Sequence, residues 1–446
     1  MRKWVVLFIV FAMAVFAAAC GGSGGSKNDG KNGASSSNAG QSAGGSGETA
    51  GKGSGKPVTL KILNGKVEIS EKMNELKAEY EASHPGVKLQ IESVMTSEVS
   101  ATLKAKYAGK EMPDIFLNGG DRDLDNWIDQ LEDLSDQPWV DDLLDMVKPP
   151  ISKDGKIYGL PVNIEGFGLA YNKALFEKAG IEKLPKTLGE LRDVMAQLKA
   201  NGIEPFAFAL QSWYSPGEHW LSVAVAQQPD PDAFIQGLFD GTEKIPGNPV
   251  FEQWVDMLDV VLEYSHGNPL TTDYNGEVTL FANGEVAMIK AGNWTQVLVD
   301  SVDPDLEVGM LPIPINDDPD YSDKVFGGVP RYWVVNKHSE NKELAKEFLN
   351  WLATSETGKR YMTDEFQFIA GFGSMTASPE ALGGLGTDLQ RYLQEDRLLR
   401  WRTMKYPEGV TQDWGSSVQE YAAGRINREQ LLQAFQDSWD KISGKK

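Results

Sequence analysis

Cysteine is almost absent from this 446-residue chain, in which Cys20 is the only one. No internal disulfide can form, so a packed core must stabilise the folded part without covalent cross-links. Cys20 follows a cationic start, Arg2-Lys3, and a 16-residue apolar run that ends in three alanines. This pattern predicts a secretory signal, because the run is too short to span a bilayer comfortably.

Residues 1–19 resemble a bacterial lipoprotein signal, in which small residues precede a cysteine that receives lipid. The resemblance implies that fatty acids such as palmitate are attached at Cys20 and anchor the protein at the outer face of the cell membrane. Ordinary secretion, with cleavage after an A-x-A site, is the alternative. Residues 21–56 are nearly all Gly, Ser, Asn, Ala and Lys. They predict a flexible tether, which indicates a Gram-positive cell surface.

Histidine is scarce, and the residue patterns of common catalytic sites are missing. The four histidines form neither an H-E-x-x-H motif nor a spaced metal cluster. The folded part has no P-loop, no dinucleotide fingerprint and no serine in a nucleophile-elbow context. We therefore expect no metal, no cofactor and no catalytic residues.

Net positive charge is also lacking. The formal charge is −21, and the signal and the linker each carry +2, so residues 57–446 carry −25. Nucleic acid is excluded as a ligand, because phosphate contacts need a basic surface. A neutral or cationic ligand is easier to accommodate than a strongly anionic one.

The folded part alternates strand-like and helical segments, which predicts an α/β fold with a largely parallel sheet. About 390 residues are too many for one core, so we expect two lobes. The predicted strands cover 58–63, 87–93, 114–117 and 158–172. The predicted helices cover 69–86, 99–108, 123–133, 173–179, 187–200, 217–227 and 250–265, and the last 70 residues are helical.

Polar and aromatic residues follow several predicted strands at the ends where open α/β sheets bind ligands. These clusters are Asn64-Gly65-Lys66, Asn118-Gly119-Gly120-Asp121, Gln211-Ser212-Trp213-Tyr214 and Asn293-Trp294. Each cluster alone is weak support for a site, but four with the same placement form a pattern.

Tryptophan is abundant, with 11 in the folded part. Trp213, Trp294 and Trp414 fall on predicted loops, and Trp294 ends the stretch FANGEVAMIKAGNW (281–294). A tryptophan offers a flat apolar face that suits the C–H face of a sugar ring, while nearby polar groups bind its hydroxyls. Packing in the core is the alternative for each, and it is favoured for the mid-helix residues Trp254, Trp351 and Trp439.

The segment DRDLDNWIDQLE (121–132) places acids at calcium-loop spacing. Asn126 replaces the glycine that such a loop needs for its sharp turn. Leu124, Ile128 and Leu131 are spaced for one face of a helix, so we favour a helix with a solvated acidic face over a calcium site.

Three segments together resemble the sugar-binding group of extracellular solute-binding proteins of ABC importers, which includes maltose-binding protein. They are GKIYGLPVNIEGFGLAYNKALFEKAGIEKLPKTLGEL (155–191), FANGEVAMIKAGNW (281–294) and GGVPRYWVVNKHSENKELAKEFLNWLATSE (327–356), and they occur in family order. The resemblance implies a two-lobed periplasmic-binding-protein fold with a ligand cleft between lobes that are joined by crossover hinges. The implied lobes are 57–165 plus 329–371 and 166–328 plus 372–446.

The resemblance also implies a set of substrate-binding residues. Trp294 takes the place of the family's aromatic platform, and Glu165 takes that of its hinge acid. Asn118 takes a place that is aromatic in maltose-binding protein, which argues against a preference for maltose. The implied contacts are Asn64, Lys66, Asn118, Asp121, Arg122, Glu165, Trp213, Tyr214, Trp294, Arg331 and Trp414.

The sequence therefore predicts a monomeric, lipid-anchored receptor that captures a sugar or oligosaccharide and delivers it to an ABC permease, without enzymatic activity. Two alternatives remain. One is a receptor of the same fold for a peptide, polyamine or phosphorylated compound. The other is a surface-tethered enzyme that acts on glycosides.

Overall fold

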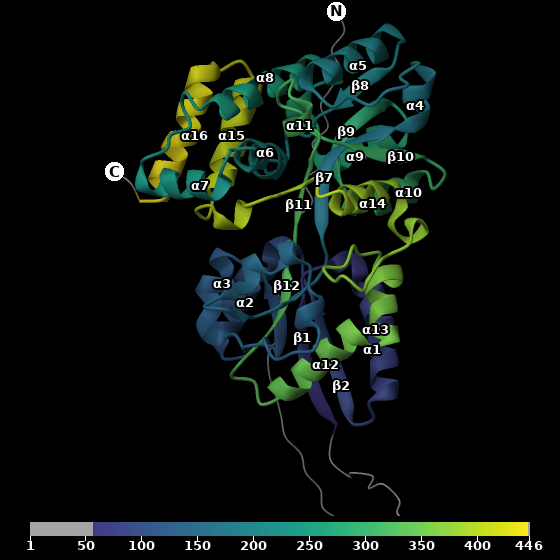
Figure 1. Cartoon of the computed structure of the whole chain (residues 1–446), viewed down its shortest axis with the longest axis vertical. Coiled ribbons are helices and arrows are strands. Elements are labelled where there is room, and N and C mark those ends of the chain that lie inside the picture. The colour runs from purple at the N-terminus through teal and green to yellow at the C-terminus, as the bar shows by residue number, and fades with distance from the viewer. Residues whose placement is uncertain (1–56, 445–446) are drawn as a thin grey trace, which may run out of the picture. The chain divides into compact units, whose positions relative to one another are not determined.

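The computed structural model of the protein describes residues 57–444. The predicted signal peptide, Cys20 and the whole linker lie outside the described residues. Within them, two separate sheets with their helices form two lobes (Figure 1). No helix of residues 57–444 is both long and apolar enough to cross a membrane.

The first lobe is built on a five-stranded sheet. Its strands, in spatial order, are β2 (Val87–Ser93), β1 (Val58–Asn64), β3 (Ile115–Asn118), β12 (Tyr332–Val335) and β6 (Leu160–Pro161). β1 runs parallel to β2 and β3, whereas β12 runs antiparallel to β3 and β6. The helices that accompany this sheet are α1 (Ser70–Ser83), α2 (Val99–Gly109), α3 (Arg122–Trp127), α12 (Lys342–Thr354) and α13 (Glu356–Arg360).

The second lobe is built on a six-stranded sheet around β7 (Glu165–Asn172), which pairs with β9, β10 and β11. The other strands are β8 (Glu204–Ala207), β9 (Val286–Gly292), β10 (Val308–Leu311), β11 (Val325–Gly328) and β13 (Leu398–Arg400). The helices around it are α4 (Lys173–Lys178), α5 (Leu188–Ala200), α8 (Pro249–Glu263), α9 (Tyr274–Ala282), α10 (Gln296–Val302), α11 (Pro319–Ser322) and α14 (Pro379–Gln394).

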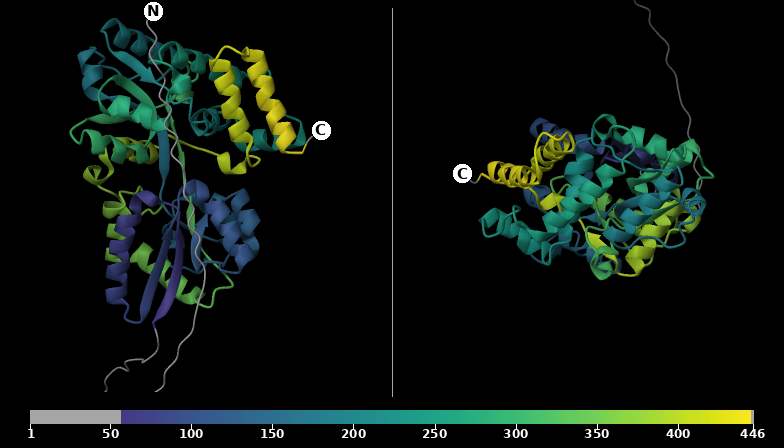
Figure 2. Two further views of the ribbon diagram at one scale, coloured as in Figure 1. Left: turned by 180° about the vertical axis from the view of Figure 1, so that it is seen from behind. Right: turned by 90° about the horizontal axis from the view of Figure 1, so that it is seen from above.

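Four further helices lie together on one flank of the second lobe, and the view from behind shows the same group (Figure 2). They are α6 (Leu221–Ala226), α7 (Pro231–Asp240), α15 (Val410–Ala422) and α16 (Arg428–Ile442). Trp254 of α8, Trp414 of α15 and Trp439 of α16 are fully buried, as their position on apolar helix faces requires.

The chain passes between the sheets three times. It leaves β6 and enters β7 at Glu165, returns from β11 into β12 after Gly328, and leaves the first lobe again between Phe372, which pairs with Leu143, and Pro379 at the start of α14. Since these segments run in alternate directions, the outgoing β7 and the returning β11 are antiparallel neighbours.

The expectation of a largely parallel sheet is therefore wrong for the second lobe. β7 is antiparallel to all three of its neighbours, and only β8–β9 and β11–β13 are parallel pairs. Strand β7 nevertheless has the apolar composition of a strand covered on both faces. Phe167 and Leu169 face one cluster of buried hydrophobic residues, and Ala170 belongs to the other.

Candidate functional site

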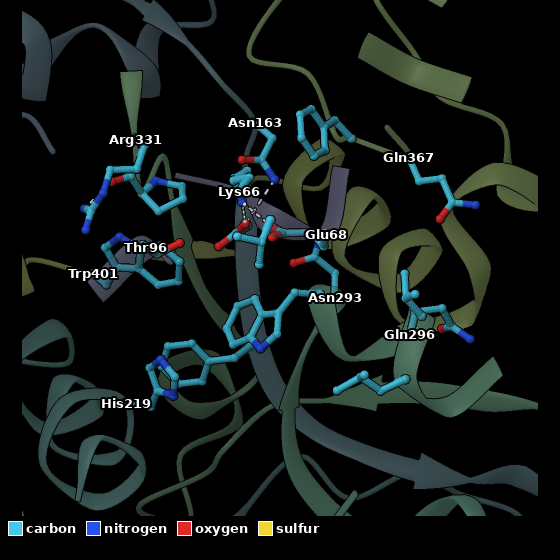
Figure 3. A pocket seen from close by; sticks show the side chains of 18 of the residues that line it. Lys66, Glu68, Thr96, Asn163, His219, Asn293, Gln296, Arg331, Gln367 and Trp401 are labelled. Carbon is cyan, nitrogen blue, oxygen red and sulfur yellow. Dashed lines mark hydrogen bonds and ion pairs between the residues drawn. The ribbon is translucent and has the colours of Figure 1, made fainter. Parts of the chain in front are cut away.

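A cavity of about 610 Å³ lies where the crossover segments meet the edges of both sheets. Its volume is within the range of about 300–1,000 Å³ that small-molecule sites occupy. In the close view, Arg331, Trp401 and His219 lie on one side, and Gln367 and Gln296 on the other (Figure 3). The walls include Lys66 and η1 (Val67–Ile69) after β1, the start of β7, η7 (Ser215–Trp220), η9 (Asn293–Thr295), α10 and the loops around 331, 367 and 402.

Trp294 lines this cavity from η9, the tight turn directly after β9. All residues of β9 are buried, so the strand fixes the point from which the indole projects. Part of the ring packs against the hydrophobic cluster that contains Phe167 and Leu169, and the remainder faces the cavity. The neighbouring Asn293 accepts a hydrogen bond from the N–H of Gly166 at 3.1 Å, which ties the turn to β7.

A second set of aromatic side chains completes the apolar wall. Trp401 follows the edge strand β13 and stacks on Phe167, with ring centres 6.0 Å apart and planes inclined by 14°. Phe366 and Phe368 line the cavity from the other lobe, with ring centres 5.4 Å apart. The cavity therefore offers aromatic faces from several directions, which suits a ligand with flat apolar faces.

Charged groups lie close together between the turn that follows β1 and the start of β7. Lys66 forms an ion pair with Glu165 at the start of β7, and its Nζ lies 3.4 Å from Glu68 Oε1. Burial opposes the charge of this lysine, but the two carboxylates outweigh burial and raise the pKa of Lys66. Asn163 Nδ2 donates to Glu165 at 3.2 Å. These groups present fixed donors and acceptors to the cavity.

Asn64 does not line the cavity but positions a residue that does. Its Oδ1 accepts from the backbone N–H of Lys66 at 3.1 Å, and its Nδ2 donates to the Lys66 carbonyl at 2.8 Å. Asn118 has a similar structural role, because its Oδ1 accepts a hydrogen bond from the N–H of Gly120 at 2.7 Å. Both asparagines are fully buried.

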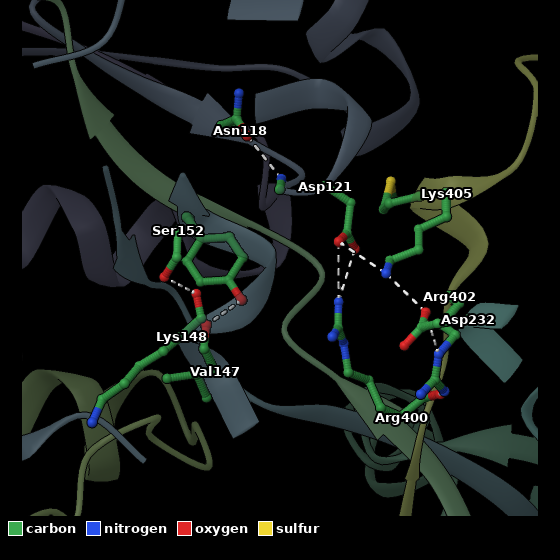
Figure 4. A network of polar contacts seen from close by, with 12 residues as sticks. Asn118, Asp121, Val147, Lys148, Ser152, Asp232, Arg400, Arg402 and Lys405 are labelled. Atoms are coloured by element: carbon green, nitrogen blue, oxygen red, sulfur yellow. Dashed lines mark hydrogen bonds and ion pairs between the residues drawn. The ribbon is translucent and has the colours of Figure 1, made fainter. Parts of the chain in front are cut away.

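Asp121 lies beside the cavity and joins the two lobes. Its carboxylate accepts hydrogen bonds from Arg400 Nη2 at 2.9 and 3.2 Å (Figure 4). Lys405 Nζ lies 3.9 Å from Asp121 and 2.8 Å from Asp232 on α7. Arg122 contributes to the same junction, since its guanidinium lies 5.9 Å from the ring centre of Phe239 on α7. These residues connect the lobes instead of facing the cavity.

The cavity thus brings together four residues that the sequence predicted: Lys66, Glu165, Trp294 and Arg331. Trp213 is 39% exposed and does not line it, and Tyr214 packs edge-on against His219 behind the wall. The prediction for Trp414 is wrong. It is a core residue within α15, not a loop residue, and its Nε1 donates to the Phe435 carbonyl at 2.9 Å.

Sequence reasoning missed more of the wall than it found. The missed side chains include Glu68, Thr96, Asn163, Phe167, Glu218, His219, Tyr274, Gln296, Phe366, Gln367, Phe368, Trp401 and Met404. The dense aromatic and arginine content of Arg400-Trp401-Arg402 was a signal for Trp401. Among residues 57–444, no three His, Cys, Asp or Glu side chains are arranged to hold a metal ion, and the acidic segment after Asp121 begins as helix α3.

Comparison with known families gives one decisive match. Residues 66–359 correspond to the family described as bacterial extracellular solute-binding protein. The chain belongs to this family. The match confirms the resemblance drawn from the three sequence segments, and the two lobes with their hinge crossings have the family's architecture.

Several relatives with similar sequences carry names of sugar-binding proteins, and others are named only as binding proteins. The maltotriose-binding protein of Pyrococcus abyssi is 26% identical over 71% of this chain and 69% of its own length. The multiple sugar-binding protein of Streptococcus mutans is 22% identical over 82% of this chain and 85% of its own. The apo form of RafE from Streptococcus pneumoniae matches the fold with a TM-score of 0.74, at 20% identity, over 88% of this chain and all of RafE.

Proposed function

We propose that this protein is a receptor that binds a sugar or oligosaccharide in the cavity between its lobes and delivers it to an ABC transporter permease. The observation that carries the proposal is the position of Trp294, on a rigid turn with part of its ring facing the cavity. Trp401 adds a second ring, and the Lys66–Glu165 pair with Asn163 supplies fixed donors and acceptors for hydroxyl groups. The names of the relatives support the same ligand class.

Binding without turnover is part of the proposal. The relatives are named as binding proteins, and the cavity walls carry amides, aromatic rings and mostly paired charges. Incubation of the protein with glycans should leave them intact. Release of a shorter product would favour the glycoside-acting enzyme instead.

The decisive experiment is a thermal-shift screen of the purified protein against mono- to tetrasaccharides, with polyamines, peptides and sugar phosphates as rival ligands. A ligand that binds only the native state, at about 100 times its dissociation constant, adds roughly 2.7 kcal/mol of stability. We expect a shift with one class of sugar. A shift with a rival ligand and with no sugar would refute the proposal.

Two matched tryptophan variants locate the site. Trp294→Ala should lower the affinity for the selected sugar by at least tenfold, because it removes the stacking surface. Trp213→Ala removes an exposed indole outside the cavity and should leave the affinity unchanged. If both variants bind as wild type, the sugar binds elsewhere.

The proposal includes an anchored, extracytoplasmic location. Cys20 would carry the lipid, residues 21–56 would act as the tether, and a Gram-positive surface fits that composition. The lobes would be 57–165 plus 329–371 and 166–328 plus 372–446, and the receptor would act as a monomer. Cys20→Ala should move the protein from the membrane fraction to the medium. If the variant stays with the membrane, the anchor is not at Cys20.

A further inference from the structure

Two neighbouring polar side chains of η7 (Ser215–Trp220) line the cavity: Glu218 and His219. This segment is one π-helical turn that leads into α6, and such turns often occur at functional sites. Helix α15 packs closely against it, since a β-carbon built on Gly217 would lie 1.9 Å from the Thr411 carbonyl oxygen. The close approach that this glycine permits fixes the backbone that carries both side chains.

His219 is held in one tautomer by a buried lysine. Lys290 is fully buried on β9, and its Nζ lies 2.8 Å from His219 Nδ1. Burial lowers the pKa of Lys290 to about 8, so at pH 7 its Nζ is an ammonium group, which only donates hydrogen bonds. Nδ1 therefore accepts, and the ring proton is on Nε2. Burial, and then the charge of Lys290, hold the pKa of His219 well below its usual value, so the ring is neutral. Its Nε2–H accordingly remains as a donor, and no described residue accepts from it.

A buried acidic side chain favours the charged form of Lys290. Glu277 of α9 is fully buried, accepts from the N–H of Ala209 at 2.9 Å and interacts electrostatically with Lys290. Lys290 Nζ also lies 5.9 Å from the ring centre of Trp294 and 6.0 Å from that of Phe167. The lysine therefore lies beneath the aromatic wall and is not itself part of the cavity lining.

Glu218 provides the complementary acceptor. Among residues 57–444, no side chain or N–H donates a hydrogen bond to its carboxylate, and no cation forms an ion pair with it. Removal from water raises the pKa of Glu218, while the charges of Arg331 and Lys290 counteract this effect. Glu218 is partly exposed to the cavity, so a bound ligand that covers it withdraws its carboxylate from water, and hydrogen bonds donated by that ligand offset the cost.

We propose that Glu218 and His219 form a specificity-determining pair, in which Glu218 accepts hydrogen bonds from hydroxyl groups of the sugar ring stacked on Trp294 and His219 donates one through Nε2–H. The centres of the His219 and Trp294 rings are 5.5 Å apart, so a stacked ring brings its hydroxyl rim to the pair. This inference rests on the proposed function. It adds the requirement that the ligand carry free hydroxyls at that edge of the ring.

The experiment measures affinity by calorimetry and stability by thermal unfolding on the full chain. The probe is the sugar with the largest shift in the panel, together with its monodeoxy derivatives. Glu218→Gln and His219→Phe each remove one partner, and His219→Gln restores an acceptor for Lys290 and a donor for the sugar. Glu182→Gln is the matched control, since Glu182 is exposed and outside the cavity.

We expect Glu218→Gln and His219→Phe to weaken binding by about 10- to 100-fold, the range for a lost charge-assisted or buried hydrogen bond. His219→Gln should restore much of the affinity, and Glu182→Gln should change nothing. Glu218→Gln should leave the melting temperature equal or higher, because it removes an unpartnered charge. The monodeoxy derivative that lacks the contacted hydroxyl should bind the wild type more weakly than the parent sugar does. The Glu218→Gln variant should bind this derivative and the parent sugar with equal affinity.

Three outcomes would overturn the inference. Wild-type affinity in Glu218→Gln and His219→Phe, with binding lost in Trp294→Ala, would refute the pair and leave the proposed function intact. A fall in stability of Glu218→Gln that matches its loss of affinity would make Glu218 a structural residue. Failure of every sugar to bind the wild type would refute the proposed function and this inference together.

Discussion

The indole of Trp294 lies directly over Gly292, so that a β-carbon built on this glycine would come within 2.2 Å of Cζ3 of the ring. The backbone of Gly292 is extended, with φ at −103°, and any residue could adopt it. The glycine is therefore required for space and not for backbone freedom. The spacing Gly292-Asn293-Trp294 thus sets the position of the ring in the cavity.

Gly292→Ala should displace the indole and weaken sugar binding by about tenfold or more, while the fold is retained because alanine adopts the extended backbone of Gly292 at the end of β9 without strain. Calorimetry gives the affinity, and the tryptophan emission spectrum reports the displaced ring. Gly109→Ala is the control, because a β-carbon there meets nothing closer than 4.0 Å. Equal affinities for both variants would show that ring position does not govern binding.

Asp121→Asn should lower the free energy of unfolding by about 1.5–3 kcal/mol, because it leaves the guanidinium of Arg400 without its carboxylate partner. Asp125→Asn is a matched change on α3, where the pair with Lys153 is exposed and contributes about 0–1 kcal/mol. Urea unfolding of both variants compares the two pairs. Equal losses would contradict a specific role for the junction between the lobes.

His219 should make stability depend on pH in a defined direction. Its folded-state pKa lies well below 6.5, owing to burial and to Lys290, so below pH 6.5 the unfolded chain binds a proton that the folded chain does not. The contribution of the neutral His219 to the free energy of unfolding is fully present above pH 6.5. It is lost as the pH falls below that value, by up to about 1.4 kcal/mol per pH unit.

The measurement is the difference in unfolding free energy between wild type and His219→Gln from pH 5 to pH 8. Other titrating groups contribute to both proteins and largely cancel. The variant should lose less stability on acidification than wild type does. His338→Gln, at an exposed histidine, should follow the wild-type curve. Parallel curves for wild type and His219→Gln would contradict a neutral His219 ring in the folded protein.

Trp401 and Trp414 should separate binding from stability. Trp401→Ala removes a wall of the cavity and should reduce sugar affinity by about tenfold, with a smaller effect on stability. Trp414→Phe leaves the cavity intact but removes core volume and the hydrogen bond to Phe435, so it should cost about 1–3 kcal/mol of stability at unchanged affinity. Affinity loss in Trp414→Phe without instability would restore Trp414 as a contact.

Local sequence signals were sufficient for much of the fold. The alternating segment 58–63 is β1, and the periodic segments 99–108 and 187–200 are α2 and α5 within one or two residues. These signals work because the spacing of apolar residues reflects burial within one element. These local signals could not predict the strand directions in the second lobe, because those directions depend on how often the chain crosses between the two sheets.

The predicted residues that line the cavity lie at or next to the ends of strands. Trp294 follows a buried strand directly, so its neighbours in sequence define its position. Trp401 depends on the pairing of β13 with β11, which no local pattern encodes. Trp414 could have been placed correctly, since Val410, Trp414 and Val418 recur every four residues and form one buried helix stripe.

The pairing of β3 with β12 also affects how the protein is made. Ile115 and Val335 are partners in the first sheet, and five of the six strands and most helices of the second lobe lie between them in the chain. A ribosome therefore releases β3 long before it has synthesised the strand beside it. Pairings between such distant segments form slowly, because a long loop must close first. The first sheet is therefore completed only after the chain has been made as far as β12, which sets a lower limit on how early in synthesis this lobe can fold.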